Sequence, residues 1–238
     1  MADNSHTRNH QFYENFPTEW HVVAKIVSNP SPLVFDVGAH RGESIEAVLN
    51  LFPDSKIIAF EANPTLAHDL VQKYINLPQV IINNFAVSST AGAADFYINE
   101  ITHSSSLFKI NHKSKDSIAI NSGKIESLGE INQKISIKAV TIDEIVQSED
   151  IQHIDVLKID AQGAEIDVLE GARNSLQHTS VVKVEVSLFD FYSQQSSLHK
   201  VETLMRDAGL TLYSIPFVSQ NPMNGRTDWV EAIYWRKP

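Results

Sequence analysis

Apolar residues follow two different spacings along this chain. Short, nearly continuous apolar runs alternate with segments in which apolar residues recur every three or four positions. The runs are typical of strands covered on both faces of a parallel sheet, and the second spacing is typical of helices that lie on such a sheet. We therefore expect strands at residues 33–37, 56–60, 80–84, 154–159 and 181–186. This alternation predicts an α/β domain.

The expected helices fill the gaps between these strands. They lie at residues 20–27, 45–52, 64–74, from 141 onward, 166–176 and 198–208. Asn63 and Pro64 suit the cap and first turn of the third helix. Two final strands, at 211–215 and 229–235, have no helix between them, which predicts an antiparallel pair at one edge of the sheet.

The middle of the chain is less regular. Residues 85–100 are expected to form a hairpin around 89–92, and residues 101–133 are rich in Ser, Asn and Lys. Alternating apolar and polar positions, typical of a strand, return at residue 135. We interpret residues 88–134 as an insertion or lid within a domain that spans 33–238, preceded by a polar tail and a helix over 1–32.

Composition and charge limit the classes of function that the chain can have. The 238 residues suit one domain, and 29 acidic against 19 basic side chains give a net charge of −10, which disfavours binding to nucleic acid. The chain has no Cys, so thiolate catalysis and cysteine-bound metals are excluded. It also has no apolar run long enough to span a membrane, and we expect it to be cytoplasmic.

Candidate chemistry begins where the first strand ends. Asp36 precedes Gly38 and Gly42, and these glycines, four residues apart, open a helix. The spacing differs from the G-x-G-x-x-G pattern that holds the pyrophosphate of a dinucleotide. Glu61 ends the second strand, where a carboxylate can accept both hydroxyls of a ribose. Together these features predict a nucleoside ligand.

Longer motifs now give a resemblance. They are Val34-Phe35-Asp36-Val37-Gly38-Ala39-His40-Arg41-Gly42-Glu43, Phe60-Glu61-Ala62-Asn63-Pro64, Leu157-Lys158-Ile159-Asp160-Ala161-Gln162-Gly163-Ala164-Glu165, Val168-Leu169-Glu170-Gly171-Ala172 and Val184-Glu185-Val186. With them, residues 33–235 resemble the FkbM family of methyltransferases. The resemblance implies a Rossmann-like, seven-stranded class I methyltransferase sheet with an antiparallel last strand. It also implies methyl transfer from S-adenosylmethionine to a hydroxyl of a small molecule or glycan.

The resemblance assigns residues to the cofactor as follows. It places Asp36, Gly38, Ala39, His40 and Gly42 around the methionine part, Glu61 with its neighbour Ala62 at the ribose, and Asn84, Phe85 and Ala86 beside the adenine. Ser104 and Ser105 resemble a serine pair in the family's central loop. Gln162 occupies a position where many members have Glu.

Catalysis would need only correct placement of the acceptor and a base for its proton. We expect Asp160 and Glu185 to act as the acid/base pair or to orient the acceptor, with His103 as the second candidate base. Mg²⁺ held by Asp160 and Glu185 is conceivable chemically but unsupported, so no metal ligand is assigned. The alternatives are an NAD-dependent oxidoreductase and a non-catalytic module that binds S-adenosylmethionine. The sequence makes no prediction of oligomeric state.

Overall fold

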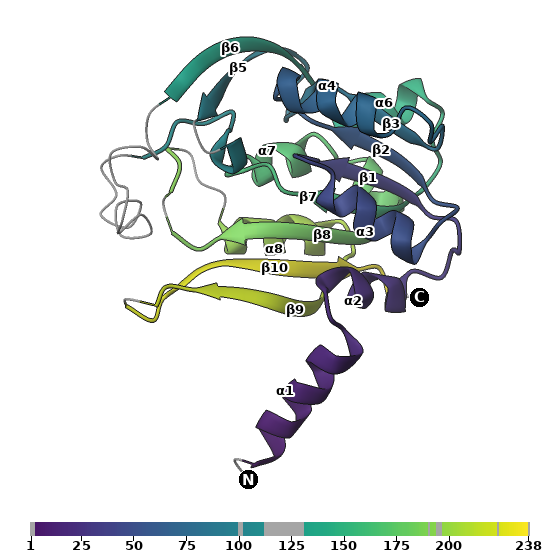
Figure 1. Ribbon diagram of the computed structural model, residues 1–238, viewed down its shortest axis with the longest axis vertical. Coiled ribbons are helices and arrows are strands. Elements are labelled where there is room, and N and C mark those ends of the chain that lie inside the picture. The colour runs from purple at the N-terminus through teal and green to yellow at the C-terminus, as the bar shows by residue number, and fades with distance from the viewer. Residues whose placement is uncertain are drawn as a thin grey trace.

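The computed structural model describes residues 3–99, 102–111, 131–189, 191–193, 197–222 and 224–237. Its main sheet has seven strands in the order β3-β2-β1-β7-β8-β10-β9 (Figure 1). These strands are β1 (Leu33–Val37), β2 (Lys56–Phe60), β3 (Val80–Asn83), β7 (Ile154–Ile159), β8 (Thr179–Ser187), β9 (Thr211–Gln220) and β10 (Thr227–Trp235). From β3 to β8 in this order, each strand is parallel to its neighbour. β10 is antiparallel to both β8 and β9. The expected sheet with an antiparallel last strand is confirmed.

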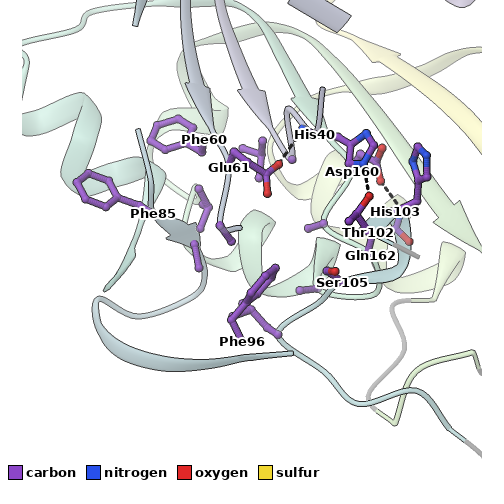
Figure 2. Close-up of a pocket in the computed structure, with 18 residues that line it drawn as sticks. His40, Phe60, Glu61, Phe85, Phe96, Thr102, His103, Ser105, Asp160 and Gln162 are labelled. Atoms are coloured by element: carbon purple, nitrogen blue, oxygen red, sulfur yellow. Dashed lines mark hydrogen bonds between the residues drawn. The ribbon is translucent and has the colours of Figure 1, made fainter. Parts of the chain in front are cut away.

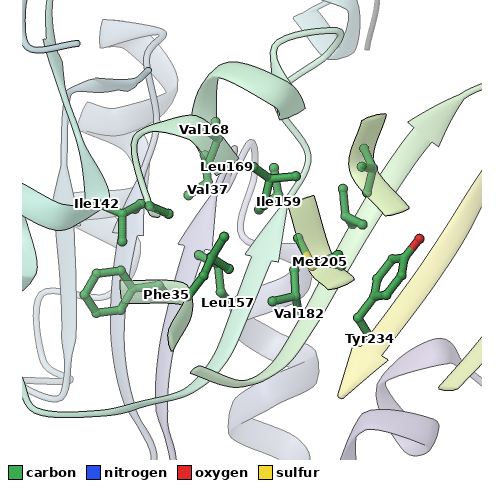
Figure 3. Packing of buried hydrophobic residues seen from close by; sticks show 14 of the residues in the cluster. Phe35, Val37, Ile142, Leu157, Ile159, Val168, Leu169, Val182, Met205 and Tyr234 are labelled. Carbon is green, nitrogen blue, oxygen red and sulfur yellow. The ribbon is translucent and has the colours of Figure 1, made fainter. Parts of the chain in front are cut away.

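Helices cover both faces of this sheet because its strands carry apolar side chains on both sides. One face packs against α6 (Ile142–Ser148), α7 (Glu165–Glu170) and α8 (Leu198–Asp207), and its core includes Phe35, Leu157 and Met205 (Figure 3). The other face packs against α2 (Glu19–Ile26), α3 (Glu43–Leu51) and α4 (Pro64–Lys73). Burial of this apolar surface is the main favourable contribution to folding.

Two helical segments differ from the expectation. Residues expected to be a polar tail include a helix, α1 (Asp3–Asn15), which extends away from the sheet (Figure 1). The single helix expected over 166–176 is instead α7 followed by a short 3-10 helix, η2 (Ser175–His178). At Gly171, between them, a Cβ would lie 2.1 Å from the carbonyl oxygen of Ser88. The chain turns where this contact is made.

The expected hairpin is wrong. The strands β4 (Ala86–Val87) and β5 (Gly92–Asn99) do not pair with each other, because β6 (Ile131–Val140) lies between them in a three-stranded sheet. β6 is parallel to β4 and antiparallel to β5. Of the proposed lid, residues 112–130 lie outside the described residues, so the lid stays a prediction. Residues 102–111, which include η1 (Thr102–Ser104), reach the carboxyl end of the main sheet.

Candidate functional site

A cavity lies at the carboxyl ends of β1, β2 and β7, where ligands bind in sheets of this kind. It encloses about 660 Å³ of empty space, counted out to its open mouth. In Figure 2, Glu61 lies between an aromatic group at one end and His40, His103 and Asp160 at the other.

The glycine loop after β1 brings backbone close to the cavity. Gly38 has a φ of +78°, and a Cβ there would lie 1.9 Å from the carbonyl oxygen of Asp160. Only glycine fits between β1 and β7 in this conformation. Gly42 has a φ of +87° and lies against Tyr74, at the start of α3 and outside the cavity lining. The two glycines of the motif therefore have different roles: Gly38 forms the wall, and Gly42 allows the helix to begin.

Glu61 is held in place by backbone amides. The amide of His40 donates to Oε2 at 2.7 Å, and the amide of Asn63 donates to Oε1 at 2.8 Å. Burial raises the pKa of Glu61 to about 7, against the effect of these two hydrogen bonds. Each oxygen keeps a second lone pair, so the carboxylate can accept further hydrogen bonds from a ligand.

Asp36 is placed differently from its expected position at the methionine part. It is buried, does not line the cavity, and accepts a short hydrogen bond from the Ser44 hydroxyl. Its Oδ1 lies 3.0 Å from Nζ of Lys158 on the neighbouring strand. Burial lowers the pKa of Lys158, but the charges of Asp36 and Asp160 outweigh that effect and raise it. Asp36 and Lys158 thus form a buried ion pair beneath the loop.

Aromatic side chains form part of the cavity lining. Phe85 and Ala86, which the resemblance assigns to adenine, line the cavity, and so do Phe60 and Phe96, which were not predicted from the sequence (Figure 2). Asn84 lies outside the lining, and its side-chain amide donates to the carbonyl oxygen of Glu61 at 2.8 Å. Asn84 therefore fixes the chain around Glu61.

Residues of η1 and the residue that follows it close the other end of the cavity. Thr102, His103 and Ser105 line it, and Nε2 of His40 lies 2.9 Å from Oγ1 of Thr102. The rings of His40 and His103 have centroids 3.9 Å apart. Burial, and then the charge of His103, lower the pKa of His40, which favours a neutral imidazole there. Ser104 is buried outside the lining.

A polar network links the predicted catalytic residues. Nε2 of Gln162 donates to Oδ1 of Asp160 at 2.7 Å and to Oε1 of Glu185 at 3.3 Å. The hydroxyl of Tyr192 donates to Oε1 of Gln162 at 2.9 Å. Asp160 and Gln162 line the cavity, whereas Glu185 lies behind Gln162. Burial, and then the charge of Asp160, raise the pKa of Glu185 well above its ordinary value, so Glu185 favours its protonated form.

The cavity brings together most of the predicted cofactor residues. Those in its lining are Gly38, His40, Glu61, Ala62, Phe85, Ala86, Ser105 and Gln162. Ala39 lines a second cavity on the other side of the glycine loop. Tyr192, Thr102 and Leu107 carry no sequence signal for a role here, because the contacts that bring them to the site are distant in sequence.

Among the described residues, no group of three or more His, Cys, Asp or Glu side chains is placed to hold a metal ion. Among the same residues, no helix has the length and apolar character needed to cross a membrane. A role for Mg²⁺ stays without support.

Named proteins with similar sequences are methyltransferases. The chain is 22% identical over 183 residues to the 2-O-methyltransferase NoeI of Sinorhizobium fredii, covering 77% of this chain and 74% of that protein. It is 27% identical to the hexuronic acid methyltransferase AglP of Haloferax volcanii over 133 residues, 56% of this chain and 47% of AglP. The crystal structure of an FkbM methyltransferase from Methylobacillus flagellatus has the same fold, with a TM-score of 0.52 and 10% identity over 95% of this chain and 57% of that one.

The family assignment rests on the domain match. Residues 36–211 match the Methyltransferase FkbM domain, and this span contains the glycine loop, Glu61 and the Asp160–Glu165 motif. The match sets aside the alternative of an NAD-dependent oxidoreductase. This chain belongs to the FkbM family of S-adenosylmethionine-dependent methyltransferases.

Proposed function

We propose that this protein transfers the methyl group of S-adenosylmethionine to a hydroxyl of a sugar or another small polyhydroxylated molecule. The observation that carries the proposal is the position of Glu61, between an aromatic wall and Asp160 in one cavity. The relatives named as a 2-O-methyltransferase and a hexuronic acid methyltransferase support a hydroxyl on a carbohydrate as the acceptor.

The residues present fit S-adenosylmethionine. Glu61 has a free lone pair on each carboxylate oxygen for the two ribose hydroxyls, and Phe85 and Ala86 provide an apolar surface for adenine. Gly38 and His40 would lie along the methionine part, since both line the cavity toward Asp160. The cofactor supplies an electrophilic methyl group when it is bound.

Asp160 is our proposed base. Its Oδ1 is occupied by Gln162, whereas Oδ2 lies 3.8 Å from Nζ of Lys158 and can accept the proton of an acceptor hydroxyl. The nearby positive charge of Lys158 stabilises the Asp160 carboxylate before that transfer. We propose Glu185 as a positioning residue, because it contacts Gln162 and favours its protonated form. His103, which also lines the cavity, is the second candidate base.

Charge and composition suit the same proposal. The net charge of −10 disfavours a nucleic acid acceptor, and the absence of Cys suits a reducing compartment, so we propose that the protein acts in the cytoplasm on a small acceptor.

Calorimetric titration with S-adenosylhomocysteine, S-adenosylmethionine and NAD tests the cofactor. We expect micromolar binding of the first two and no binding of NAD. Binding of NAD alone would overturn the proposal. Retained binding of S-adenosylhomocysteine without turnover on a broad acceptor panel would instead favour a non-catalytic module.

Two variants then separate binding from chemistry. Glu61→Ala should weaken S-adenosylhomocysteine binding by about 1 to 3 kcal/mol through lost ribose hydrogen bonds. Asp160→Asn should bind it normally and lose most turnover. Normal turnover by Asp160→Asn would remove Asp160 as the base and leave His103 as the residue to test.

A further inference from the structure

A second cavity lies on the α2 and α3 side of the sheet, next to the proposed cofactor cavity. It encloses about 880 Å³ of empty space, counted out to its open mouth. Strand residues Lys158, Lys183 and Glu231 line it, as do Glu19 and Trp20 of α2. None of these five residues lines the first cavity.

The two cavities meet at the predicted chemistry. Gly38, His40, His103 and Asp160 line both of them. A molecule in the second cavity can therefore reach Asp160 from the side opposite the aromatic wall. Both candidate bases, Asp160 and His103, lie at this junction.

Both lysines in the second cavity are already paired with acidic side chains. Nζ of Lys183 lies 2.6 Å from Oε2 of Glu231 and 3.7 Å from Oε1 of Glu19. Nζ of Lys158 lies 3.0 Å from Oδ1 of Asp36 and donates to the carbonyl oxygen of Gly38 at 2.6 Å. Neither ammonium is left to pair with an acidic ligand.

The carboxylates are more available. The side chain of Glu19 is 29% exposed and that of Glu231 is 14% exposed, against 5% for Lys183. Glu43 at the rim is 63% exposed. Carboxylates accept hydrogen bonds strongly from hydroxyl groups and repel another carboxylate. The lining thus favours a ligand with several hydroxyls and no negative charge.

We propose that this second cavity binds the methyl acceptor, that the acceptor is a neutral sugar, and that Glu19 and Glu231 accept hydrogen bonds from its hydroxyls. The inference rests on the proposed function and adds the acceptor site and its charge preference. Glu19, Trp20 and Glu231 lie outside residues 36–211, which match the family domain. Acceptor choice is therefore set by segments that flank the domain.

Paired acceptors test the charge preference. Methyl galactoside and methyl galacturonoside differ only at C6, and methyl glucoside with methyl glucuronoside gives a second pair. Methyl transfer from S-adenosylmethionine is measured as S-adenosylhomocysteine formed, with KM and kcat for each acceptor. We expect turnover of neutral glycosides, with kcat/KM at least tenfold above that of the matching uronate.

The variant Glu19→Gln tests the site itself. It removes one charge while keeping the size of the side chain, and we expect the acceptor KM to rise about tenfold with kcat and S-adenosylhomocysteine affinity unchanged. Glu170→Gln, on α7, is the matched control and should leave the acceptor KM unchanged. Glu19→Asp keeps the charge and should recover part of the loss, which separates a binding role from a general effect on folding.

The remaining outcomes overturn different parts of the proposal. Preference for uronates would overturn the neutral acceptor, and an unchanged KM in Glu19→Gln would overturn the site. Normal S-adenosylhomocysteine binding with no glycoside turned over would overturn the sugar assignment and leave the cofactor cavity standing. No binding of S-adenosylhomocysteine at all would overturn the proposed function, on which this inference rests.

Discussion

Glu61 is a buried carboxyl group whose ionisation should control cofactor affinity. Burial raises its pKa to about 7, and the amides of Asn63 and His40 and the charge of Lys158 act in the opposite direction. Ribose hydroxyls donate to the charged form, so binding favours loss of the proton. We predict that S-adenosylhomocysteine affinity rises about tenfold between pH 6 and pH 8, measured by calorimetry. Glu61→Gln should bind more weakly and lose most of this dependence.

The same pKa predicts an effect on stability in the absence of ligand. The ordinary value is 4.5, so between pH 4.5 and 7 the folded protein binds more protons at Glu61 than the unfolded chain does. The free energy of unfolding should therefore fall as pH rises through this window. Urea unfolding of the wild type and of Glu61→Gln from pH 5 to 8 measures the difference. An equal pH dependence in both proteins would contradict the assigned pKa.

Tyr192 is a buried residue whose hydroxyl supports Gln162 and, through it, Asp160. Tyr192→Phe removes the hydroxyl that donates to Gln162 and to the carbonyl oxygen of Ser104, and we expect a loss of about 1 kcal/mol in unfolding free energy. Because Tyr192 acts as a positioning residue, Tyr192→Phe should lower kcat several-fold without changing the affinity for S-adenosylhomocysteine. Tyr213→Phe, at an exposed position on β9, should change neither quantity. A changed KM with constant kcat would contradict the positioning role.

Single residues of the site were predictable where their role is local. Gly38 and Glu61 directly follow predicted strands, and parallel strands place their carboxyl ends together. Asp36 was assigned to the ligand by the resemblance, and its contact with Lys158 was not predicted. That contact depends on the pairing of β1 with β7, which are more than a hundred residues apart. Tyr192 could not be found in advance for the same reason.

At the scale of elements, Asp143 ties α6 to η2. Its carboxylate accepts hydrogen bonds from the backbone amides of Asn174 and Ser175 and from both of their side chains. Asp143→Ala removes all four, and we predict a loss of at least about 2 kcal/mol in unfolding free energy, measured with urea. The exposed Asp54→Ala serves as the control. A loss no greater than that of the control would show that water replaces these bonds without cost.

Elements with strong local signals were predictable, and those defined by distant contacts were not. Asn63, for example, caps α4 as its position before Pro64 predicted, with its side chain accepting from the amide of Thr65 at 3.0 Å. The hairpin expected over 85–100 does not form, because β5 pairs with β6. Asn99 and Ile131 are register partners in that pair, although they are far apart in the sequence. Local spacing did not indicate that β6 would lie between β4 and β5.

Across the whole molecule, the cofactor cavity joins elements from most of the chain. Its lining comes from β1, β2, the three-stranded sheet, η1 and the segment after β7. These elements are not brought together in the unfolded chain. A ligand that touches all of them therefore binds only the folded state. Binding should therefore stabilise the entire domain rather than one loop.

We predict a gain of about 2.7 kcal/mol in unfolding free energy when S-adenosylhomocysteine is present at 100 times its Kd, measured by urea unfolding. Asp160→Asn should keep this gain, since Asp160 is assigned to the acceptor proton. Glu61→Gln should lose part of it at the same ligand concentration, because its Kd is higher. NAD should give no gain, since the glycines of the loop do not follow the pyrophosphate pattern. Equal stabilisation by NAD would mean that the cavity recognises only the adenosine that the two ligands share, and that the methionine end of the site has been misplaced.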